Sequence, residues 1–181
     1  MILLIKYFIY FPLLLRFWAS KQKKEIIQDL CVGNKKLYES INTNFINRVA
    51  SDKYFRSVFY FRTRGLFTNF LRILYPKERY FIIDIHSKIG GGIITAHPFG
   101  TIINAESIGQ NLYINHLVTI GEKNGRKPVI GNNVELHANC CIIGGVTIGD
   151  NVVIGAGTVV TKDIPENVVV IGTANRIINK K

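Results

Sequence analysis

Cysteine is scarce in this chain, and its spacing excludes both a disulfide-stapled fold and a fold built on a cysteine zinc site. The three cysteines are Cys31, Cys140 and Cys141, an odd number with two adjacent in sequence. Such a set does not build a disulfide framework, and no spacing among them matches the paired ligands of a zinc site. We therefore expect reduced thiols, as is usual in the cytoplasm, with one of the adjacent pair in the core.

Acidic residues are also scarce, and the shortage is confined to one part of the chain. The 12 Asp and Glu face 23 Lys and Arg, a formal net charge of +11. Residues 1–80 carry a net +10, whereas residues 81–181 carry only +1. This asymmetry predicts an anionic partner for residues 1–80, either a membrane surface or nucleic acid. No nucleic-acid-binding module accompanies the charge, so we expect no nucleic-acid partner.

The chain lacks an apolar run long enough to cross a membrane. Residues 1–18 are apolar but are interrupted by Lys6, Pro12 and Arg16, whereas a spanning helix needs about 20 predominantly apolar residues. A signal peptide places its positive charge before the apolar run, not inside it. We predict a helix here that either lies on a membrane surface or packs on the protein.

Residues 20–80 have helical spacing. Residues 21–31 and 37–49 each predict a short helix, and residues 52–74 predict a longer one that ends before Pro76. The longer segment interleaves aromatic residues with Arg56, Arg62, Arg64 and Arg72. Two interpretations stay open for it: a helix packed on its neighbours with a solvated basic face, or a helix that docks on anionic lipid headgroups.

A six-residue spacing of aliphatic side chains dominates the second half of the sequence. It runs through Ile102, Ile108, Ile114 and Ile120, and resumes as Ile130, Leu136, Ile142, Ile148, Ile154 and Val160. A helix repeats near 3.6 residues and a strand near 2, so neither element alone explains a period of six. A hexapeptide repeat does, because three hexads make one coil of a triangular β-helix. We predict a mainly β fold, a left-handed parallel β-helix over residues 81–181, preceded by an α-helical region over residues 1–80.

Two interruptions of the period locate irregular corners. We assign Ile83, Ile89 and Thr95 to the first inward positions, followed after a slip of one residue by Ile102. The step from Ile120 to Ile130 is ten residues, so a loop within residues 121–129 adds about four residues to one corner. Loops that leave such a repeat often cover a functional site.

The period also places chemically active residues in one column. Counted from the inward positions, His97, His116, Ala138 and Ala156 occupy equivalent places in successive coils, about 4.8 Å apart, with His137 one residue away. An imidazole titrates near neutrality and suits general-base work on a hydroxyl. Asp84 is the nearest upstream acid that could hold its second ring nitrogen. Two alanines below the histidines leave a slot for a long, thin cofactor arm.

Three segments of the sequence resemble a known family. They are IDIHSKIGGGIITAHPFGTIINAESIG, LVTIGEKNGRKPVIG and VTIGDNVVIGAGTVVTKDIP, and they are similar to the serine acetyltransferase branch of the left-handed β-helix, or hexapeptide-repeat, acyltransferases. The resemblance implies acetyl-CoA as donor and a homotrimer with active sites between neighbouring β-helices. It also implies that His97 is the catalytic base, that Asp84 orients it, and that Ala138 and Ala156 line the CoA groove. We also assign Gly121, Lys162 and Arg176 to donor binding, and expect either that Arg176, Lys180 and Lys181 meet the nucleotide end of CoA or that this basic tail is solvated.

The sequence departs from that family where the acceptor is recognised. Ala96 stands where the family has an Asp before the catalytic His, and Lys127 replaces a loop His that helps to hold serine, although Arg126 is kept. The segment from Asp84 to His97 is about two residues shorter than in the family, and Ala174 replaces a Pro. We assign His116, Arg126 and Lys127 to acceptor binding.

These observations predict a CoA-dependent O-acetyltransferase. The changed acceptor residues and the basic N-terminal region favour a sugar hydroxyl of a surface polysaccharide or its precursor, with the enzyme in the cytoplasm or peripheral on the inner face of the plasma membrane. Serine O-acetylation for cysteine biosynthesis is the first alternative, and a non-catalytic trimeric, membrane-associated scaffold is the second. A zinc-dependent carbonic anhydrase of the same fold is disfavoured, because its three histidines lie between subunits whereas His97, His116 and His137 share one wall. We therefore expect no metal.

Overall fold

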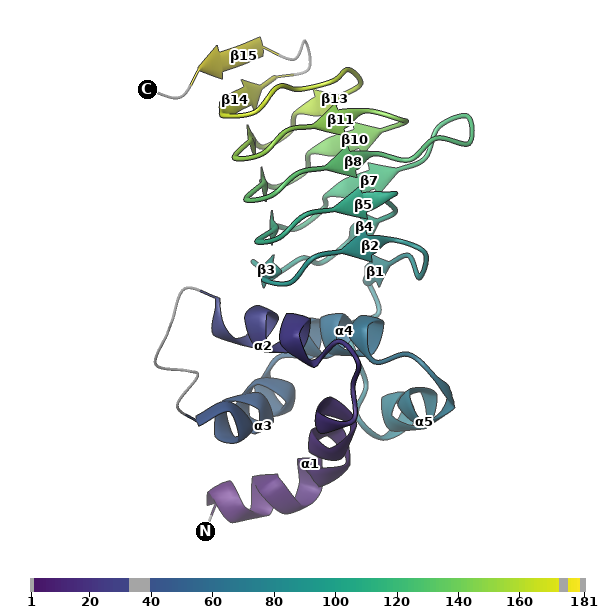
Figure 1. Cartoon of the computed structure of the whole chain (residues 1–181), viewed down its shortest axis with the longest axis vertical. Coiled ribbons are helices and arrows are strands. Elements are labelled where there is room, and N and C mark those ends of the chain that lie inside the picture. The colour runs from purple at the N-terminus through teal and green to yellow at the C-terminus, as the bar shows by residue number, and fades with distance from the viewer. Residues whose placement is uncertain (1, 33–39, 173–175, 180–181) are drawn as a thin grey trace. The chain divides into compact units, whose positions relative to one another are not determined.

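The computed structural model describes residues 2–32, 40–172 and 176–179. The chain forms two compact units, Met1–Glu78 and Arg79–Lys181. The first is helical, and the second is built of short strands (Figure 1). Each unit has its own core, and each is described by itself below.

In the described part of the helical unit, five helices pack around an aromatic core. They are α1 (Ile2–Trp18), α2 (Lys23–Cys31), α3 (Ile41–Ser51), α4 (Lys53–Arg62) and α5 (Leu66–Leu74). Phe45 of α3 lies at the centre, with its ring 4.8 Å from that of Phe17 on α1 and 5.1 Å from that of Phe59 on α4. Such paired rings contribute more than their buried area alone. The predicted helix over residues 21–31 is confirmed by α2, whereas residues 37–39 of the next predicted helix lie outside the described residues.

The single helix predicted over residues 52–74 is wrong, because two helices occupy this segment. The backbone of Gly65 has φ = 129°, a conformation that side-chain-bearing residues rarely adopt, and it separates α4 from α5. Asp52 caps the start of α4, since its carboxylate accepts hydrogen bonds from the N–H groups of Tyr54 and Phe55 at 2.8 and 3.0 Å. The turn at Gly65 gives α5 a direction of its own.

The basic face predicted for this segment is also partly wrong. The Arg62 side chain is 1% exposed, and its guanidinium donates to the equally buried carboxylate of Asp29 at 3.0 and 3.2 Å. Arg56 is likewise engaged, donating through Nε to the carbonyl of Pro76 at 2.8 Å. Arg64 and Arg72 are exposed. Two of the four arginines therefore serve the packing of the unit, because arginine binds carboxylates and carbonyl oxygens in a planar fork.

Among the helices that the structure describes, none is both long enough and apolar enough to cross a bilayer.

The second unit is a coil whose successive turns add strands to three parallel sheets (Figure 1), with an isolated bridge between Ile148 and Ile164 in place of a second-sheet strand in the last turn. The first sheet has the order β1-β4-β7-β10-β13, the second β2-β5-β8-β11, and the third β3-β6-β9-β12-β14 with β15 antiparallel at its end. The strands are β1 (Phe81–Ile83), β2 (Lys88–Ile89), β3 (Ile94–Thr95), β4 (Thr101–Ile103), β5 (Ser107–Ile108), β6 (Tyr113–Ile114), β7 (Thr119–Gly121), β8 (Val129–Ile130), β9 (Glu135–Leu136), β10 (Cys141–Ile143), β11 (Thr147–Ile148), β12 (Val153–Ile154), β13 (Val159–Val160), β14 (Val168–Ile171) and β15 (Arg176–Asn179).

The strand register confirms the stacking predicted from the six-residue period. Ile142 pairs with Val160, 18 residues later, and Ile120 pairs with Ile142, 22 residues later. The difference of four residues is the predicted loop between β7 and β8. The buried aliphatic column that results fills the inside of the coil. Cys140 lies in this core as predicted for one of the adjacent pair, and burial raises the pKa of its thiol to about 12.

One inward position was predicted wrongly. Ile102 is 42% exposed, and the neighbouring Ile103 is fully buried and pairs with Ile83 and Ile120. The step from Thr95 to Ile103 is therefore eight residues. The two additional residues widen the corner that contains His97, and the next corner is one residue shorter to compensate.

An asparagine ladder closes one corner of the coils. Asn111, Asn133, Asn151 and Asn167 stack, and each side-chain amide donates to the next side-chain oxygen at 2.9 Å. All four have positive φ between 54° and 60°. Asparagine tolerates this left-handed backbone better than other side-chain-bearing residues, so these positions suit the tight corner of the repeat.

Candidate active site

The predicted column of histidines and alanines lies along one corner of the β-helix. We call this corner, which follows the strands of the third sheet, the histidine edge. Thr95 pairs with Ile114, Ile114 with Leu136, and Leu136 with Ile154. The residues two positions beyond them are His97, His116, Ala138 and Ala156. The corner hydrogen bonds confirm the alignment of the last three, since the Asn139 N–H donates to the carbonyl of His116 and the Gly157 N–H to that of Ala138. In the first coil the corresponding acceptor, for the Leu117 N–H, is the carbonyl of Phe99, so Phe99 aligns with His116 and His97 lies in the additional residues of the widened corner. The predicted alignment is therefore wrong for His97, and the chemical roles of the residues stay predictions.

The corner at His97 is the widened one. His97 is exposed and has φ = 52°, and its carbonyl accepts a hydrogen bond from the N–H of Phe99 at 2.7 Å. The ring of Phe99, also exposed, lies 5.2 Å from that of Tyr80. This corner presents an imidazole next to an aromatic surface, and solvent or a substrate can reach the ring.

The next two histidines have partners that orient them. Nδ1 of His116 lies 2.6 Å from Oδ1 of Asn115, which also accepts the backbone N–H of His116 at 2.8 Å. An acceptor oxygen there requires a proton on Nδ1, which leaves Nε2 of neutral His116 able to accept. Nε2 of His137 instead lies 3.5 Å from the Glu135 carboxylate. His116 therefore offers an acceptor, whereas His137 is engaged by its own strand.

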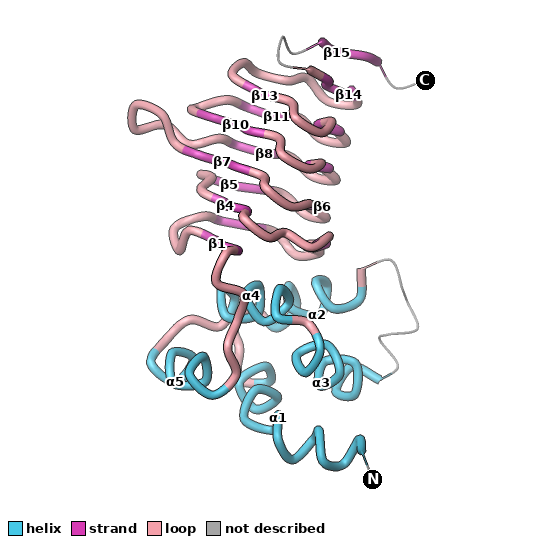
Figure 2. The backbone as a smooth tube through the Cα atoms, turned by 180° about the vertical axis from the view of Figure 1, so that it is seen from behind, coloured by secondary structure: helices cyan, strands magenta, loops and turns pink. Residues whose placement is uncertain are grey.

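The remaining predicted residues gather at a second corner. We call this corner, which follows the strands of the first sheet, the loop edge. It holds Asp84 after β1, residues 122–128 after β7, and Lys162 after β13, with Gly121 at the end of β7. Figure 2 shows the loop between β7 and β8 standing out from the coils at this corner. Arg126 and Lys162 are exposed, as expected for groups that meet a ligand.

Lys127 returns from the loop to Asp84, two coils away. Its Nζ lies 3.6 Å from Oδ1 of Asp84, and the same oxygen accepts the backbone N–H of His86 at 2.8 Å. The His86 N–H and then the Lys127 charge hold the pKa of Asp84 below its ordinary value. Asp84 is therefore a carboxylate at neutral pH, and the pair holds the base of the loop against the coil.

The loop is seated on the coil that follows it. Lys123 and Arg126 exchange backbone hydrogen bonds at 3.0 and 3.2 Å, which closes the loop as a tight turn. A Cβ on Gly145 would lie 2.8 Å from Cβ of Arg126. Only glycine leaves room for the stem of Arg126 at this place, so Gly145 sets how close the loop lies to its neighbour.

Within one chain the structure does not bring Asp84 to His97. Asp84 follows a first-sheet strand and His97 follows a third-sheet strand, so they occupy different corners of the triangular coil. The same division separates Gly121 and Lys162 from Ala138 and Ala156. The predicted site residues thus form two groups on two edges. Arg176 lies in β15, beyond the last coil, and Ala174, Lys180 and Lys181 fall outside the described residues.

Two residues at these edges were not predicted. Asn115 orients His116, and nothing in the six-residue period marks it, because it is simply the preceding residue. Asn104 lies on the loop edge one coil after Asp84, and its Oδ1 is buried with no hydrogen-bond partner among the described residues. A polar residue at a corner of the repeat is common, so its spacing alone carries no functional signal.

No three His, Cys, Asp or Glu side chains in the described part of the chain come close enough together to hold a metal ion.

The family described as Bacterial transferase hexapeptide (six repeats) matches residues 127–162. Serine acetyltransferase 3, mitochondrial, of Arabidopsis thaliana is 38% identical over 108 residues, which are 56% of this chain and 28% of that protein. The serine acetyltransferase of Helicobacter pylori strain 26695 is 36% identical over 105 residues, 54% of this chain and 61% of that protein. The chain is therefore similar, over these segments, to serine acetyltransferases and to the bacterial hexapeptide transferases.

A solved structure extends the likeness to most of the chain. The Neisseria gonorrhoeae serine acetyltransferase in complex with serine has a TM-score of 0.70 and 26% identity, covering 92% of this chain and 73% of that one. This confirms the predicted left-handed β-helix preceded by a helical region. The aligned segments span 28% and 61% of the two relatives named above, so this chain matches only part of those proteins.

Proposed function

We propose that the protein is an acetyl-CoA-dependent O-acetyltransferase whose active site lies between the histidine edge of one chain and the loop edge of the next. The names of the relatives support acetyl transfer to a hydroxyl. The observation that carries the shared site is the division of the predicted residues between two edges. A threefold ring apposes one edge of each chain to a different edge of its neighbour, as heterologous cyclic contacts do.

In this arrangement each edge has its own task. His97 of one chain takes the proton from the acceptor hydroxyl, and Asp84 of the neighbour holds the second ring nitrogen. The hydroxyl oxygen attacks the thioester carbonyl and forms a tetrahedral oxyanion. Collapse of this intermediate breaks the carbon–sulfur bond, and the departing thiolate takes the proton from the imidazolium. The products are the acetyl ester and CoA, and His97 is neutral again.

The donor side of the proposal rests on small side chains. Ala138 and Ala156 continue the column below the histidines, and Ala156 is exposed, so an extended pantetheine arm can lie close to the backbone there. Gly121 and Lys162 of the neighbouring loop edge would form the opposite wall, and the exposed charge of Lys162 suits a phosphate of CoA. The backbone N–H groups of the corner can stabilise the oxyanion.

The acceptor is proposed from the relatives. All three carry serine in their names, and one was solved with serine, so L-serine is the acceptor that we favour. The sugar hydroxyl expected from Ala96 and Lys127 has no counterpart among these relatives. It is kept as a second candidate because Lys127 is engaged by Asp84 and the Asp before the base is absent. A peripheral location at the inner face of the plasma membrane is compatible with either acceptor.

The activity is tested by incubating the purified protein with acetyl-CoA and L-serine and measuring free CoA thiol together with O-acetylserine by mass. We expect serine-dependent release of CoA with equal formation of O-acetylserine. A matched set of sugar acceptors at the same concentration distinguishes the two candidates. Release with a sugar and not with serine would replace the acceptor, and absence of release with every acceptor would favour the non-catalytic scaffold.

A further inference from the structure

Helix α1 is apolar on both of its faces, and only one of them is buried. Leu14 and Phe17 are buried, and Tyr7 and Tyr10 pack against the same core. On the opposite side a second stripe, Leu4, Phe8, Phe11, Leu15 and Trp18, follows helical spacing and is exposed, with Phe8 84% exposed. A helix that is apolar all round is normally buried on all sides. The described residues of this unit therefore leave the second apolar stripe of α1 exposed to solvent.

Helix α5 repeats the same pattern. It buries only Thr68 and Leu71, whereas Leu66, Phe67, Phe70, Ile73 and Leu74 are exposed, Leu66 by 90%. Soluble proteins rarely expose so many large apolar side chains together, and such patches mark sites of interaction.

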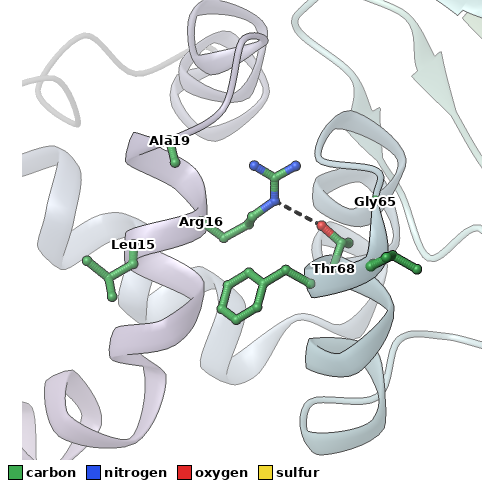
Figure 3. A pocket seen from close by; sticks show the side chains of 7 residues that line it. Leu15, Arg16, Ala19, Gly65 and Thr68 are labelled. Atoms are coloured by element: carbon green, nitrogen blue, oxygen red, sulfur yellow. Dashed lines mark hydrogen bonds between the residues drawn. The ribbon is translucent and has the colours of Figure 1, made fainter.

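The exposed stripes of α1 and α5 meet at a hollow. Leu15 of α1 and Ala19, just after this helix, line a hollow of about 310 Å³ together with Leu66 and Phe67 from the start of α5. Figure 3 shows Arg16 reaching across this hollow to α5, where its Nε donates to Oγ1 of Thr68 at 2.9 Å. The guanidinium also donates to the carbonyls of Thr63 and Arg64 at 3.1 and 2.9 Å. Arg16 thus fixes the two helices to one another.

The charges around this apolar surface have one sign. Residues 1–24 and 53–77, which contain α1 and α5, hold no Asp or Glu. Arg64 and Arg72 are exposed beside and within α5, and Lys21 and Lys24 are exposed just beyond α1. A protein partner usually presents mixed polar groups at the rim of its interface. A bilayer of anionic lipids instead has a layer of negatively charged headgroups above its hydrocarbon interior. A surface that combines exposed apolar side chains with charges of positive sign only fits the bilayer better.

We propose that the exposed apolar residues of α1 and α5 form a docking surface for a bilayer of anionic phospholipids. The apolar side chains enter the headgroup–acyl boundary, and the flanking cations meet the phosphates. Neither helix spans the bilayer, in keeping with their lengths and composition. This docking is independent of the acetyltransferase proposal, because it uses only residues of the helical unit and requires no catalysis.

The chain supplies its own probe for the test. Its single tryptophan, Trp18, belongs to the exposed stripe of α1. Addition of phosphatidylglycerol-containing vesicles to the full-length protein should shift the Trp18 emission to shorter wavelength, and brominated lipids should quench it. Pure phosphatidylcholine vesicles should do neither, and the response should weaken as salt screens the headgroup charge. An unchanged emission with anionic vesicles would overturn the proposal without any variant.

A pair of variants with the same change of charge isolates the apolar contribution. Phe70→Glu combined with Ile73→Glu alters two exposed residues of α5 and lowers the net charge by two. Lys88→Glu, at an exposed position of the β-helix unit, lowers it by the same amount and leaves the docking surface intact. We expect co-sedimentation with anionic vesicles to fall about tenfold or more in the double variant and to persist in Lys88→Glu. Equal losses in both variants would overturn the proposal. A second contrary result would be a wild-type chain that self-associates through this surface. In that case the double variant would abolish the self-association, and vesicles would leave the Trp18 emission unchanged.

Discussion

Replacing His97 by asparagine is expected to lower kcat about 10²- to 10⁴-fold, the contribution usual for a general base. Asparagine suits this test because the backbone at His97 has φ = 52°, and six of the eight non-glycine residues with positive φ in the described chain are asparagines. The substitution therefore keeps the corner unstrained and removes only the group that accepts the proton. Steady-state release of CoA measures the effect.

His137 provides the matched control for this variant. It lies near the same edge, and its Nε2 is engaged by Glu135 at 3.5 Å. His137→Asn should leave kcat unchanged, and both variants should unfold at the wild-type temperature. A His97→Asn protein with wild-type kcat would show that another group takes the proton.

Replacing Asp29 by alanine is expected to lower the free energy of unfolding of the helical unit by about 3–5 kcal/mol. The Asp29 and Arg62 side chains are each 1% exposed, so the variant leaves the Arg62 charge buried without its carboxylate. The expected loss of free energy exceeds the net stabilisation by the pair. The reason is that the cost of removing the Arg62 charge from water remains, whereas the attraction to the Asp29 carboxylate that offset it is gone. Urea denaturation followed by Trp18 emission reports on this unit specifically.

Two further variants separate a buried charge from an ordinary ion pair. Asp29→Leu together with Arg62→Met removes both charges and should recover most of the lost stability. Glu106→Ala breaks the exposed pair with Lys88 at 3.7 Å and should change stability by less than about 0.5 kcal/mol. A loss below about 1 kcal/mol for Asp29→Ala would contradict the expected cost of removing the carboxylate from the buried guanidinium of Arg62.

The β-helix could be predicted from the sequence because its repeat is local. Each hexad brings one inward aliphatic residue, so counting from Ile108 to Val160 locates the coils, the four-residue loop and the column of His116, Ala138 and Ala156. The count failed at Ile102, because the corner at His97 takes two more residues and the next corner one fewer. Two adjacent isoleucines fit either register, and only packing selects Ile103.

Features that depend on contacts distant in sequence could not be predicted in this way. Arg62 belongs to an aromatic–basic stripe that suggested a solvated face, yet Asp29, 33 residues earlier, draws it into the core. Lys127 likewise meets Asp84 across two coils, which no local pattern indicates. The break at Gly65 was overlooked because the apolar spacing continues on either side of it.

The shared active site is tested most directly by combining two inactive chains. His97→Asn disables the histidine edge and Asp84→Asn disables the loop edge, so each variant alone should have little activity. When the two are co-expressed with different tags and isolated as a mixed threefold ring, about one site in three should pair an intact histidine edge with an intact loop edge. We predict that the mixed assembly regains a corresponding share of the wild-type CoA release. A mixed assembly no more active than either variant alone would contradict a site built from two neighbouring chains.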